Sequence, residues 1–183
     1  RWLLGGGVKL PTGNFNKSNM VIPSTSVKGN VVYGSPFEEL DPHFQPGSGS
    51  LDFLAVSEFL IRYKGVGLAT NLSYRLNTEN KNEFRFANRL NANATAFYLY
   101  RFLKKYAIVP SLGLDFEFAN RDKFKGELFE NSGGTALFST LGTKVYFDKF
   151  AFGFTYFNPI TQQLNDNQLP NKKRITGDLT YYF

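Results

Sequence analysis

The sequence of 183 residues contains no cysteine, and it has only one methionine, one tryptophan and one histidine. The lack of cysteine excludes a disulfide framework, on which many small secreted domains depend. No stretch of about 18 consecutive apolar residues occurs, so a transmembrane helix is excluded as well. Because one histidine and scattered carboxylates offer no metal-ligand spacing, we predict neither a metal nor another cofactor.

The single histidine, His43, lies in a segment rich in proline and glycine, close to Ser48 and Ser50. Hydrolysis by a serine nucleophile requires an imidazole held within hydrogen-bond reach of that serine. The run of proline, glycine and serine at 46–50 indicates a loop without such a fixed geometry. We therefore predict that the protein is not an enzyme, with a hydrolase as the weaker alternative.

Aromatic and basic residues are abundant. Phenylalanine accounts for 20 residues and tyrosine for 10, and both are favoured in β-strands. The formal net charge is +6 and the sequence pI is about 9.4. Because lysine and arginine are spread along the chain and no nucleic-acid-binding motif occurs, we exclude nucleic acid as a partner. The positive charge then belongs to a solvated surface or attracts anionic lipid head groups and solutes.

Apolar and polar residues alternate with a period of two over most of the sequence, and helical periodicity is nearly absent. The clearest example is the end of the chain, residues 174–183. Its apolar positions are Ile175, Gly177, Leu179, Tyr181 and Phe183, and the positions between them are Arg174, Thr176, Asp178, Thr180 and Tyr182. Successive side chains of a strand point to opposite faces, so this segment has one apolar and one polar face. A strand between lipid and a hydrated lumen shows this pattern.

Seven further segments alternate in the same way, and we predict strands over 1–10, 51–63, 66–76, 84–102, 106–119, 135–147 and 150–158. The connections alternate in length. Tight turns are expected at 64–65, 103–105 and 148–149, and longer polar stretches occupy 11–50, 77–83, 120–134 and 159–173. Short turns on one side and long loops on the other are typical of outer-membrane barrels, whose turns are periplasmic. The segment 84–102 exceeds the ~9–11 residues that cross a bilayer, so its Phe84 end is expected to project above the membrane.

The predicted fold class is therefore all-β, an antiparallel up-and-down transmembrane β-barrel with at least eight strands in this chain. Residues 1–183 form a single domain, and 11–50 form a long extracellular loop. The mean hydropathy of −0.28 agrees with this prediction, because lipid-facing and lumen-facing residues average out. The predicted location is the outer membrane of a Gram-negative cell, with outer-membrane lipid as a partner.

The predicted lumen face carries charges of both signs, which must pair or be hydrated. Its residues are Lys9, Asp52, Glu58, Arg62, Arg75, Arg85, Arg89, Arg101, Asp115, Glu117, Lys144, Arg174 and Asp178. Two interpretations remain open. Salt bridges could close the lumen, or the face could line a hydrated path whose basic stretch favours anionic or polar solutes. The number of strands decides between them, because eight strands leave an interior just filled by side chains.

Four short motifs resemble a known family. They are the strand end Gly7-Val8-Lys9-Leu10-Pro11-Thr12-Gly13, the strand start Gln45-Pro46-Gly47-Ser48-Gly49-Ser50-Leu51-Asp52, the hairpin entry Asn131-Ser132-Gly133-Gly134 and the end Tyr181-Tyr182-Phe183. In these motifs the sequence is similar to the outer-membrane transporters grouped as the "MetA-pathway of phenol degradation" family. The resemblance implies further strands before Arg1 and a complete barrel of 10–12 strands. It also implies passage of small, often aromatic or hydrophobic, molecules, and it carries over no catalytic residue.

The ending with an aromatic residue, any residue and phenylalanine resembles the terminal signal by which outer-membrane barrels are recognised for assembly. Tyr181 and Phe183 match this signal, which makes the barrel assembly machinery an expected partner. The leading functional hypothesis is an outer-membrane channel or transporter for small solutes. The alternative is a non-transporting barrel that anchors, or is an accessory subunit of, a larger complex with other outer-membrane proteins.

Overall fold

The computed structural model describes residues 1–13, 15, 26–28, 31–33, 42–103 and 105–183. Over these residues the protein is all-β, since its regular elements are strands apart from one short 3₁₀ turn, η1 (Pro42–Phe44). No helix in this part of the chain is long and apolar enough to cross a membrane.

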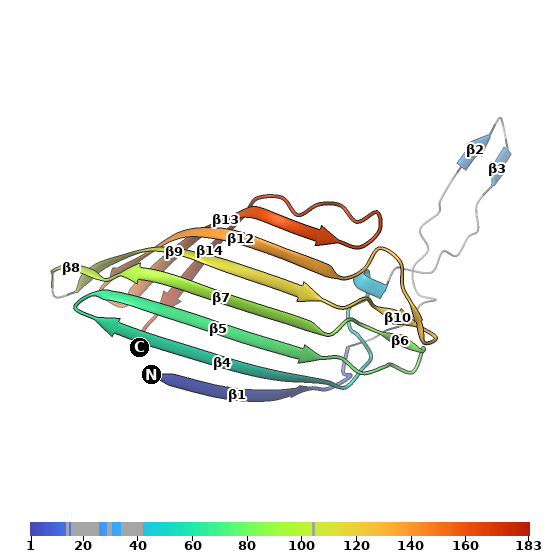
Figure 1. The fold of residues 1–183 in the computed structure, drawn as a ribbon, viewed down its shortest axis with the longest axis horizontal. Coiled ribbons are helices and arrows are strands. Elements are labelled where there is room, and N and C mark those ends of the chain that lie inside the picture. Colours follow the sequence, from blue (N-terminus) through green and yellow to red (C-terminus); the bar gives the residue numbers. More distant parts are fainter. Residues whose placement is uncertain (14, 16–25, 29–30, 34–41, 104) are drawn as a thin grey trace.

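The main sheet is antiparallel and follows the order of the chain (Figure 1). Its strands are, in order, β1 (Trp2–Lys9), β4 (Asp52–Tyr63), β5 (Val66–Leu76), β7 (Arg89–Tyr98), β9 (Tyr106–Ala119), β12 (Gly134–Phe147), β13 (Phe150–Leu164) and β14 (Arg174–Tyr181). A short strand, β8 (Tyr100–Leu103), pairs with the beginning of β9. The predicted all-β class and the antiparallel order of neighbouring strands are confirmed.

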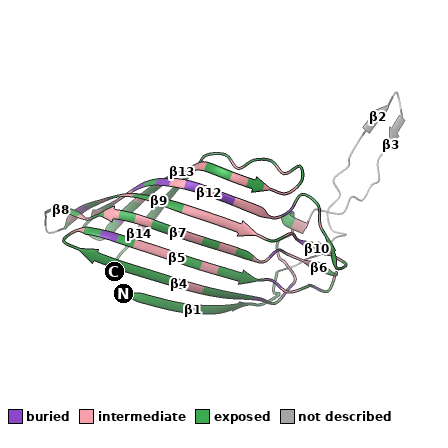
Figure 2. Cartoon of the chain, viewed as in Figure 1, coloured by how far each residue is buried: buried purple, intermediate pink, exposed green. Residues whose placement is uncertain are grey.

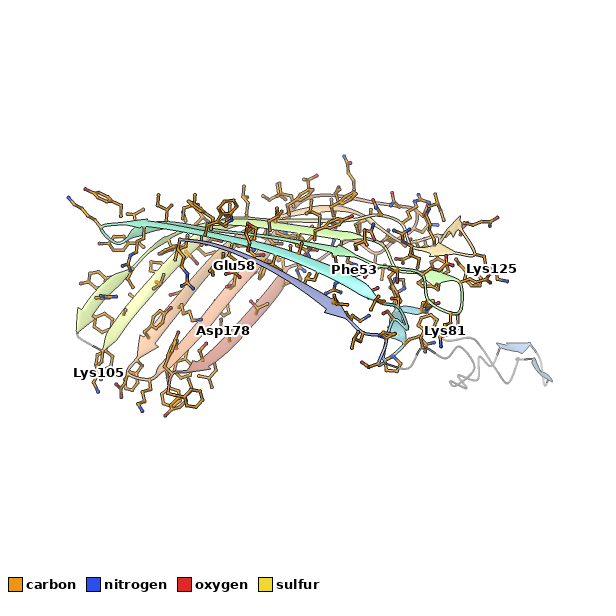
Figure 3. All side chains as sticks on the ribbon, turned by 90° about the horizontal axis from the view of Figure 1, so that it is seen from below. Phe53, Glu58, Lys81, Lys105, Lys125 and Asp178 are labelled. Carbon is orange, nitrogen blue, oxygen red and sulfur yellow. The ribbon has the colours of Figure 1, made fainter. Side chains whose placement is uncertain are left out.

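The sheet is open. Within the described residues, β1 pairs with β4 alone and β14 pairs with β13 alone, so both outer strands keep a free edge. The predicted closure into a barrel is therefore absent from this sheet. Figure 3 shows that the sheet is strongly twisted and bent, so that the side formed by β12, β13 and β14 turns away from β4 and β5.

Tight turns and long connections lie at opposite ends of the sheet, as expected. The turn between β4 and β5 is formed by Lys64 (φ 49°) and Gly65 (φ 101°), and positive φ at both central residues suits the twist of a hairpin. The turn between β12 and β13 is formed by Asp148 and Lys149. We call the end of the sheet with these two turns the turn end, and the opposite end the loop end.

The prediction of one strand over 84–102 is wrong. Residues Phe84–Arg85 form β6, which belongs to a separate small sheet with β10 (Lys123–Phe124) and β11 (Glu127–Leu128). The reason lies at Ala87, whose amide donates to Asp122 Oδ1 at 2.6 Å and whose carbonyl accepts a bond from Asn77 Nδ2. At Ala87 these hydrogen bonds to side chains replace the backbone hydrogen bonds that would pair it with a neighbouring strand. Phe84 therefore belongs to the small sheet and not to the end of a long strand.

Three predicted loops also contain strand residues. The stretch 120–134 holds β10 and β11, and β13 continues to Leu164 past a bulge opposite Leu137 and Phe138. In the predicted loop 11–50, the described residues include a short hairpin of β2 (Ser26–Lys28) and β3 (Val31–Tyr33) as well as η1. The remainder of that loop between 16 and 41 lies outside the described residues.

Many large apolar residues of the main sheet are exposed. Most of the sheet is exposed or half-buried, and only short stretches are buried (Figure 2). Among the described residues the buried apolar side chains are mostly alanines: Phe84, Ala87, Ala107, Ala136, Phe138 and Ala151. By contrast, Leu112 is 63% exposed, Leu179 65% and Trp2 66%. A water-soluble domain buries such residues in a shared core. This sheet leaves them exposed.

Candidate functional site

The register of the strands places the predicted lumen residues, apart from Arg85, on one face of the main sheet. Each of the cross-strand pairs joins residues of the same face. We call this face the polar face, and its charged residues are Lys9, Asp52, Glu58, Arg62, Arg75, Arg89, Arg101, Asp115, Glu117, Lys144, Arg174 and Asp178. The sequence pattern therefore grouped these residues correctly.

Arg85 was expected among them but lies elsewhere. It belongs to β6, opposite Lys123 in the small sheet, and its Nε donates to the carbonyl of Asn77 at 3.0 Å. Arg85 lies there because strand pairing with the main sheet is broken at Ala87. β7 begins only at Arg89, so Arg85 comes before the chain enters that strand.

The opposite face, which we call the apolar face, is formed by aromatic and branched side chains. In the centre of the sheet Leu112 stands between Ala96 and Leu141, and in the last two strands Phe152 pairs with Leu179. Further members are Trp2, Phe59, Ile61, Leu68, Leu72, Ile108, Leu114, Phe150, Phe154, Ile175 and Tyr181. Most of the exposed apolar residues thus lie together on this face, although Leu3, Leu54 and Leu60 are exposed on the polar face.

Two ion pairs on the polar face join strands that are not neighbours in the sheet. Lys144 Nζ on β12 lies 3.0 Å from Asp178 Oδ2 on β14, across β13. Arg174 on β14 reaches Glu117 Oε1 on β9 at 2.7 Å, across both β12 and β13. Neighbouring strands are about 4.8 Å apart, so side chains three strands apart meet most easily when the face that carries them is concave. We conclude that the polar face is the concave one over β9 to β14.

The side chain of Arg174 also lies over two aromatic rings. Its guanidinium carbon lies 4.1 Å from the ring centre of Phe138 and 5.2 Å from that of Phe157. Phe138 is fully buried beneath it. The cation–π contacts with these rings and the ion pair with Glu117 together hold the Arg174 side chain across the sheet.

Glycines leave room for the side chains that cross the concave face. Gly153 lies between Lys144 and Asp178 in register, and a Cβ added there would stand 1.9 Å from Asp178 Oδ1. At Gly67 a Cβ would meet the ring of Phe97 at 2.2 Å. Small residues between charged ones therefore permit ion pairing across β13.

Replacing Gly153 with valine is expected to push Asp178 aside, break its pair with Lys144 and lower the free energy of unfolding by about 1–3 kcal/mol through overpacking. Urea unfolding in detergent or lipid measures this. The matched control is Gly5→Val, also on the polar face, where an added Cβ meets nothing within 4 Å. An equal loss at Gly5 and Gly153 would contradict the crowding of the concave face.

A second cluster lies at the loop end around Asp52, whose side chain is 2% exposed. Asp52 Oδ2 accepts a bond from Lys9 Nζ at 2.7 Å, and Oδ1 accepts from Ser50 Oγ at 2.7 Å and from the amide of Thr78 at 3.3 Å. Ser48 bonds to Lys9 and to Ser50. The two serines near His43 therefore form part of a cluster around a carboxylate that joins three segments of the chain.

His43 itself contacts a different acid. Its Nε2 lies 2.9 Å from Asp122 Oδ2, and the Asp122 side chain is 2% exposed. Asp122 Oδ1 also accepts a hydrogen bond from the amide of Ala87, and the amide of Asp122 donates a hydrogen bond to Ser132 Oγ at 3.0 Å. Sequence reasoning missed Asp122, although Ser132 belongs to the Asn131-Ser132-Gly133-Gly134 motif that was noted.

Aromatic rings form the core of the small sheet at the loop end. Phe84 is 1% exposed and packs against Phe15, Phe86, Phe124 and Phe129, with ring centres 4.9 to 6.5 Å apart. Such edge and offset contacts stabilise a compact cluster. The loop end thus has its own small hydrophobic core, which the main sheet lacks.

The polar face borders a hollow at each end of the sheet. One, of about 360 Å³ at the loop end, is lined by Arg89, Asn91, Glu117, Asp122 and Gln168 among others. The other, of about 1030 Å³ at the turn end, is lined by Arg62, Phe97, Arg101 and Tyr146 among others. Both contain arginine and neutral polar groups together with acids, and the second also has several apolar side chains.

The turn end carries one further ion pair. Lys105 Nζ lies 2.8 Å from Asp148 Oδ1, which joins the turn before β9 to the turn between β12 and β13. The hydrogen bond and charge of Asp148 raise the pKa of Lys105. A raised lysine pKa means that this pair is present at neutral pH and is lost only as the pH rises through the folded-state value.

No family model, no curated protein and no solved structure matches this chain. The resemblance to the "MetA-pathway of phenol degradation" family therefore stays a prediction from the four motifs. Among the described residues no group of three histidine, cysteine or acidic side chains is placed to hold a metal ion. What the fold offers instead is a sheet with an apolar convex face and a charged concave face.

Proposed function

We propose that the main sheet is the membrane-embedded wall of an outer-membrane β-barrel, with the apolar face toward hydrocarbon and the polar face toward a hydrated lumen. The observation that carries this proposal is the inverted placement of side chains. Leu112 and Leu179 on the apolar face are about two-thirds exposed, while Asp52 on the opposite face is buried. Large continuous apolar surfaces mark contact with a membrane or with another protein.

Strand length supports the same proposal. β4 has 12 residues, β5 has 11, and β9 and β12 have 14 each. A tilted strand needs ~9–11 residues to cross the hydrocarbon core. These strands therefore suffice to span a bilayer and to extend beyond it at the loop end.

A membrane position requires that β1 and β14 find partners. In hydrocarbon an unpaired backbone amide or carbonyl costs several kcal/mol, so an open sheet edge is not tolerated there. The proposal therefore includes closure of the sheet through further strands, as the resemblance to a family of larger barrels implies. A barrel of 10–12 strands, wider than eight, leaves space in the lumen.

The function we propose is a passive channel or transporter for small solutes. The concave polar face and its hollow of about 1030 Å³ supply the hydrated wall. Single-channel conductance of the purified full-length protein in a planar bilayer tests this. Stepwise conductance is expected, and a sealed membrane together with no swelling of solute-loaded liposomes would overturn it.

A second candidate is a non-transporting barrel that anchors a larger envelope complex. The ion pairs Lys144–Asp178 and Arg174–Glu117 favour it, because side chains that cross the polar face reduce the open space. Purification from native membranes discriminates between the two candidates. A stoichiometric partner without conductance supports the anchor, and conductance without a partner supports the channel.

Replacing Phe183 with alanine is expected to lower the amount of protein assembled in the outer membrane several-fold without a matching loss of stability. Phe183 is fully exposed, and the one ring contact it makes among the described residues is with Tyr181, at 5.4 Å between centres, so its removal costs little packing. Heat-modifiable mobility of membrane fractions measures assembly. The control is Leu169→Ala, also highly exposed; equal levels for both variants would argue against a terminal signal.

A further inference from the structure

Among the described residues, four of the five acids of the polar face have an ion-pair or hydrogen-bond partner and Asp115 has none, whereas several arginines of this face take part in no ion pair. Asp52 is bound by Lys9, Glu117 by Arg174 and Asp178 by Lys144. Glu58 accepts a bond from Asn71 at 3.3 Å. Within the described part of the chain, Arg62, Arg75, Arg89 and Arg101 take part in no ion pair. The face therefore has an excess of uncompensated positive charge.

Arg75 and Arg89 stand directly opposite each other on β5 and β7. Residues opposite in an antiparallel pair have Cβ atoms about 4.5–5.5 Å apart, and like charges in this position are destabilising. The acid diagonal to Arg89 is Glu117, which pairs with Asn91 in register and is already held by Arg174 at 2.7 Å. The acid diagonal to Arg75 is Asp52, which Lys9 holds at 2.7 Å, so the acids nearest to the two arginines are already paired.

The residues beside this arginine pair are neutral hydrogen-bonding groups. Toward the centre of the sheet the next opposed pairs on the same face are Ser73 with Asn91, and Asn71 with Asn93. Arg89 and Asn91 also line the hollow of about 360 Å³ at the loop end. The two acids in that lining, Glu117 and Asp122, are occupied by Arg174 and His43. A small group with negative charge would thus meet cations and amides in this place.

We propose that Arg75 and Arg89 together bind an oxyanion, the carboxylate or phosphate group of a small solute, at the loop end of the polar face. Two guanidinium groups present several N–H donors in a planar fork that matches the oxygens of these groups. The bound charge relieves the repulsion between the two arginines. This inference rests on the proposed channel function for the origin of the solute, but the binding itself is measurable without transport.

Calorimetric titration of the detergent-folded full chain with inorganic phosphate, and separately with acetate, tests the proposal. Low ionic strength is needed, because the screening length falls from about 10 Å at 0.1 M to about 3 Å at 1 M. Binding of at least one probe is expected, with a Kd weakened about tenfold or more in the double variant R75Q/R89Q. The matched control K172Q/K173Q removes two charges at the same end but outside the polar face, and it is expected to bind like the wild type.

Which probe binds identifies the class of solute. Phosphate alone indicates a phosphorylated solute, and acetate alone indicates a carboxylate. No binding of either probe to the wild type, or unchanged binding in R75Q/R89Q, overturns the site. The unfolding midpoint of R75Q/R89Q is expected to stay equal or rise, because like-charge repulsion is removed. The variant R75K/R89K keeps the charge but not the fork, and intermediate binding is expected.

Conductance separates this inference from the proposed function. If the protein conducts, the reversal potential in a salt gradient is expected to show anion preference in the wild type and a shift toward cations in R75Q/R89Q. Conductance without binding of phosphate or acetate would support the proposed channel function and overturn the proposed arginine site. Binding without conductance retains the site and removes the channel.

Discussion

Replacing Leu112 with arginine is expected to destabilise the membrane-inserted protein by about 2–4 kcal/mol, while the same replacement at Ser111 costs much less. Leu112 lies in the middle of β9 on the apolar face, between Ala96 and Leu141. In a bilayer an arginine there has to leave its charge in hydrocarbon or reach a distant interface.

Ser111 is the matched control, because it occupies the same strand at the same depth but points to the polar face. Its partner on β12 is Gly142, which leaves room for a longer side chain. An arginine at Ser111 meets a hydrated and already charged surface. Urea unfolding of both variants in lipid vesicles gives the two free energies directly.

The comparison also decides whether the sheet is in a membrane at all. In water the side chain of Leu112 would be about two-thirds exposed, and exchange of an exposed leucine for arginine would change stability by less than about 0.5 kcal/mol. A neutral effect at Leu112, or equal effects at the two positions, would therefore overturn the face assignment and with it the membrane proposal.

The two faces could be predicted from the sequence because strand periodicity is two and the tight turns fix the register. A hairpin closed by Lys64 and Gly65 aligns β4 with β5 residue by residue, so Glu58 and Arg62 must share a face with Asn71 and Gly67. The alternation along each strand then assigns every charged residue between the turns.

The break of the segment 84–102 could not be predicted in this way. It depends on Asp122, which lies 35 residues away in sequence and bonds to the amide of Ala87. The alternation of apolar and polar residues is interrupted at Ala87 and Asn88, but the local sequence contains no sign of the bond to Asp122. Arg85 was misplaced for this reason.

Ion pairs that cross a strand are equally hidden. Lys144 and Asp178 meet only because β13 places Gly153 between them, which requires the register of two hairpins at once. Whether the sheet closes depends on the partners of β1 and β14, and no local pattern encodes these.

Replacing Asp52 with alanine is expected to lower the free energy of unfolding by about 2–3 kcal/mol, since hydrogen bonds to a charged group contribute about 1.5–3 kcal/mol and their loss leaves partners unpaired. The Asp52 carboxylate is 2% exposed and accepts hydrogen bonds from Lys9, from Ser50 and from the amide of Thr78. Lys9 is 46% exposed, so part of its charge is solvated and the cost stays below that of a fully buried pair.

The comparison for Asp52 is Asp178→Ala, which removes an ion pair of the same chemistry from the same face. Asp178 is 58% exposed and its lysine partner 34%, so less than about 1 kcal/mol is expected there. Asp52→Asn keeps the shape and the bonds to Ser50 and Thr78, and it is expected to lie between the two alanine variants. Because Asp52 ties the chain at 48–50 to β1 and to the loop after β5, Asp52→Ala is also expected to increase proteolytic cleavage near those residues. Equal stability and equal cleavage in Asp52→Ala and Asp178→Ala would show that the cluster does not fix the loop end of the sheet.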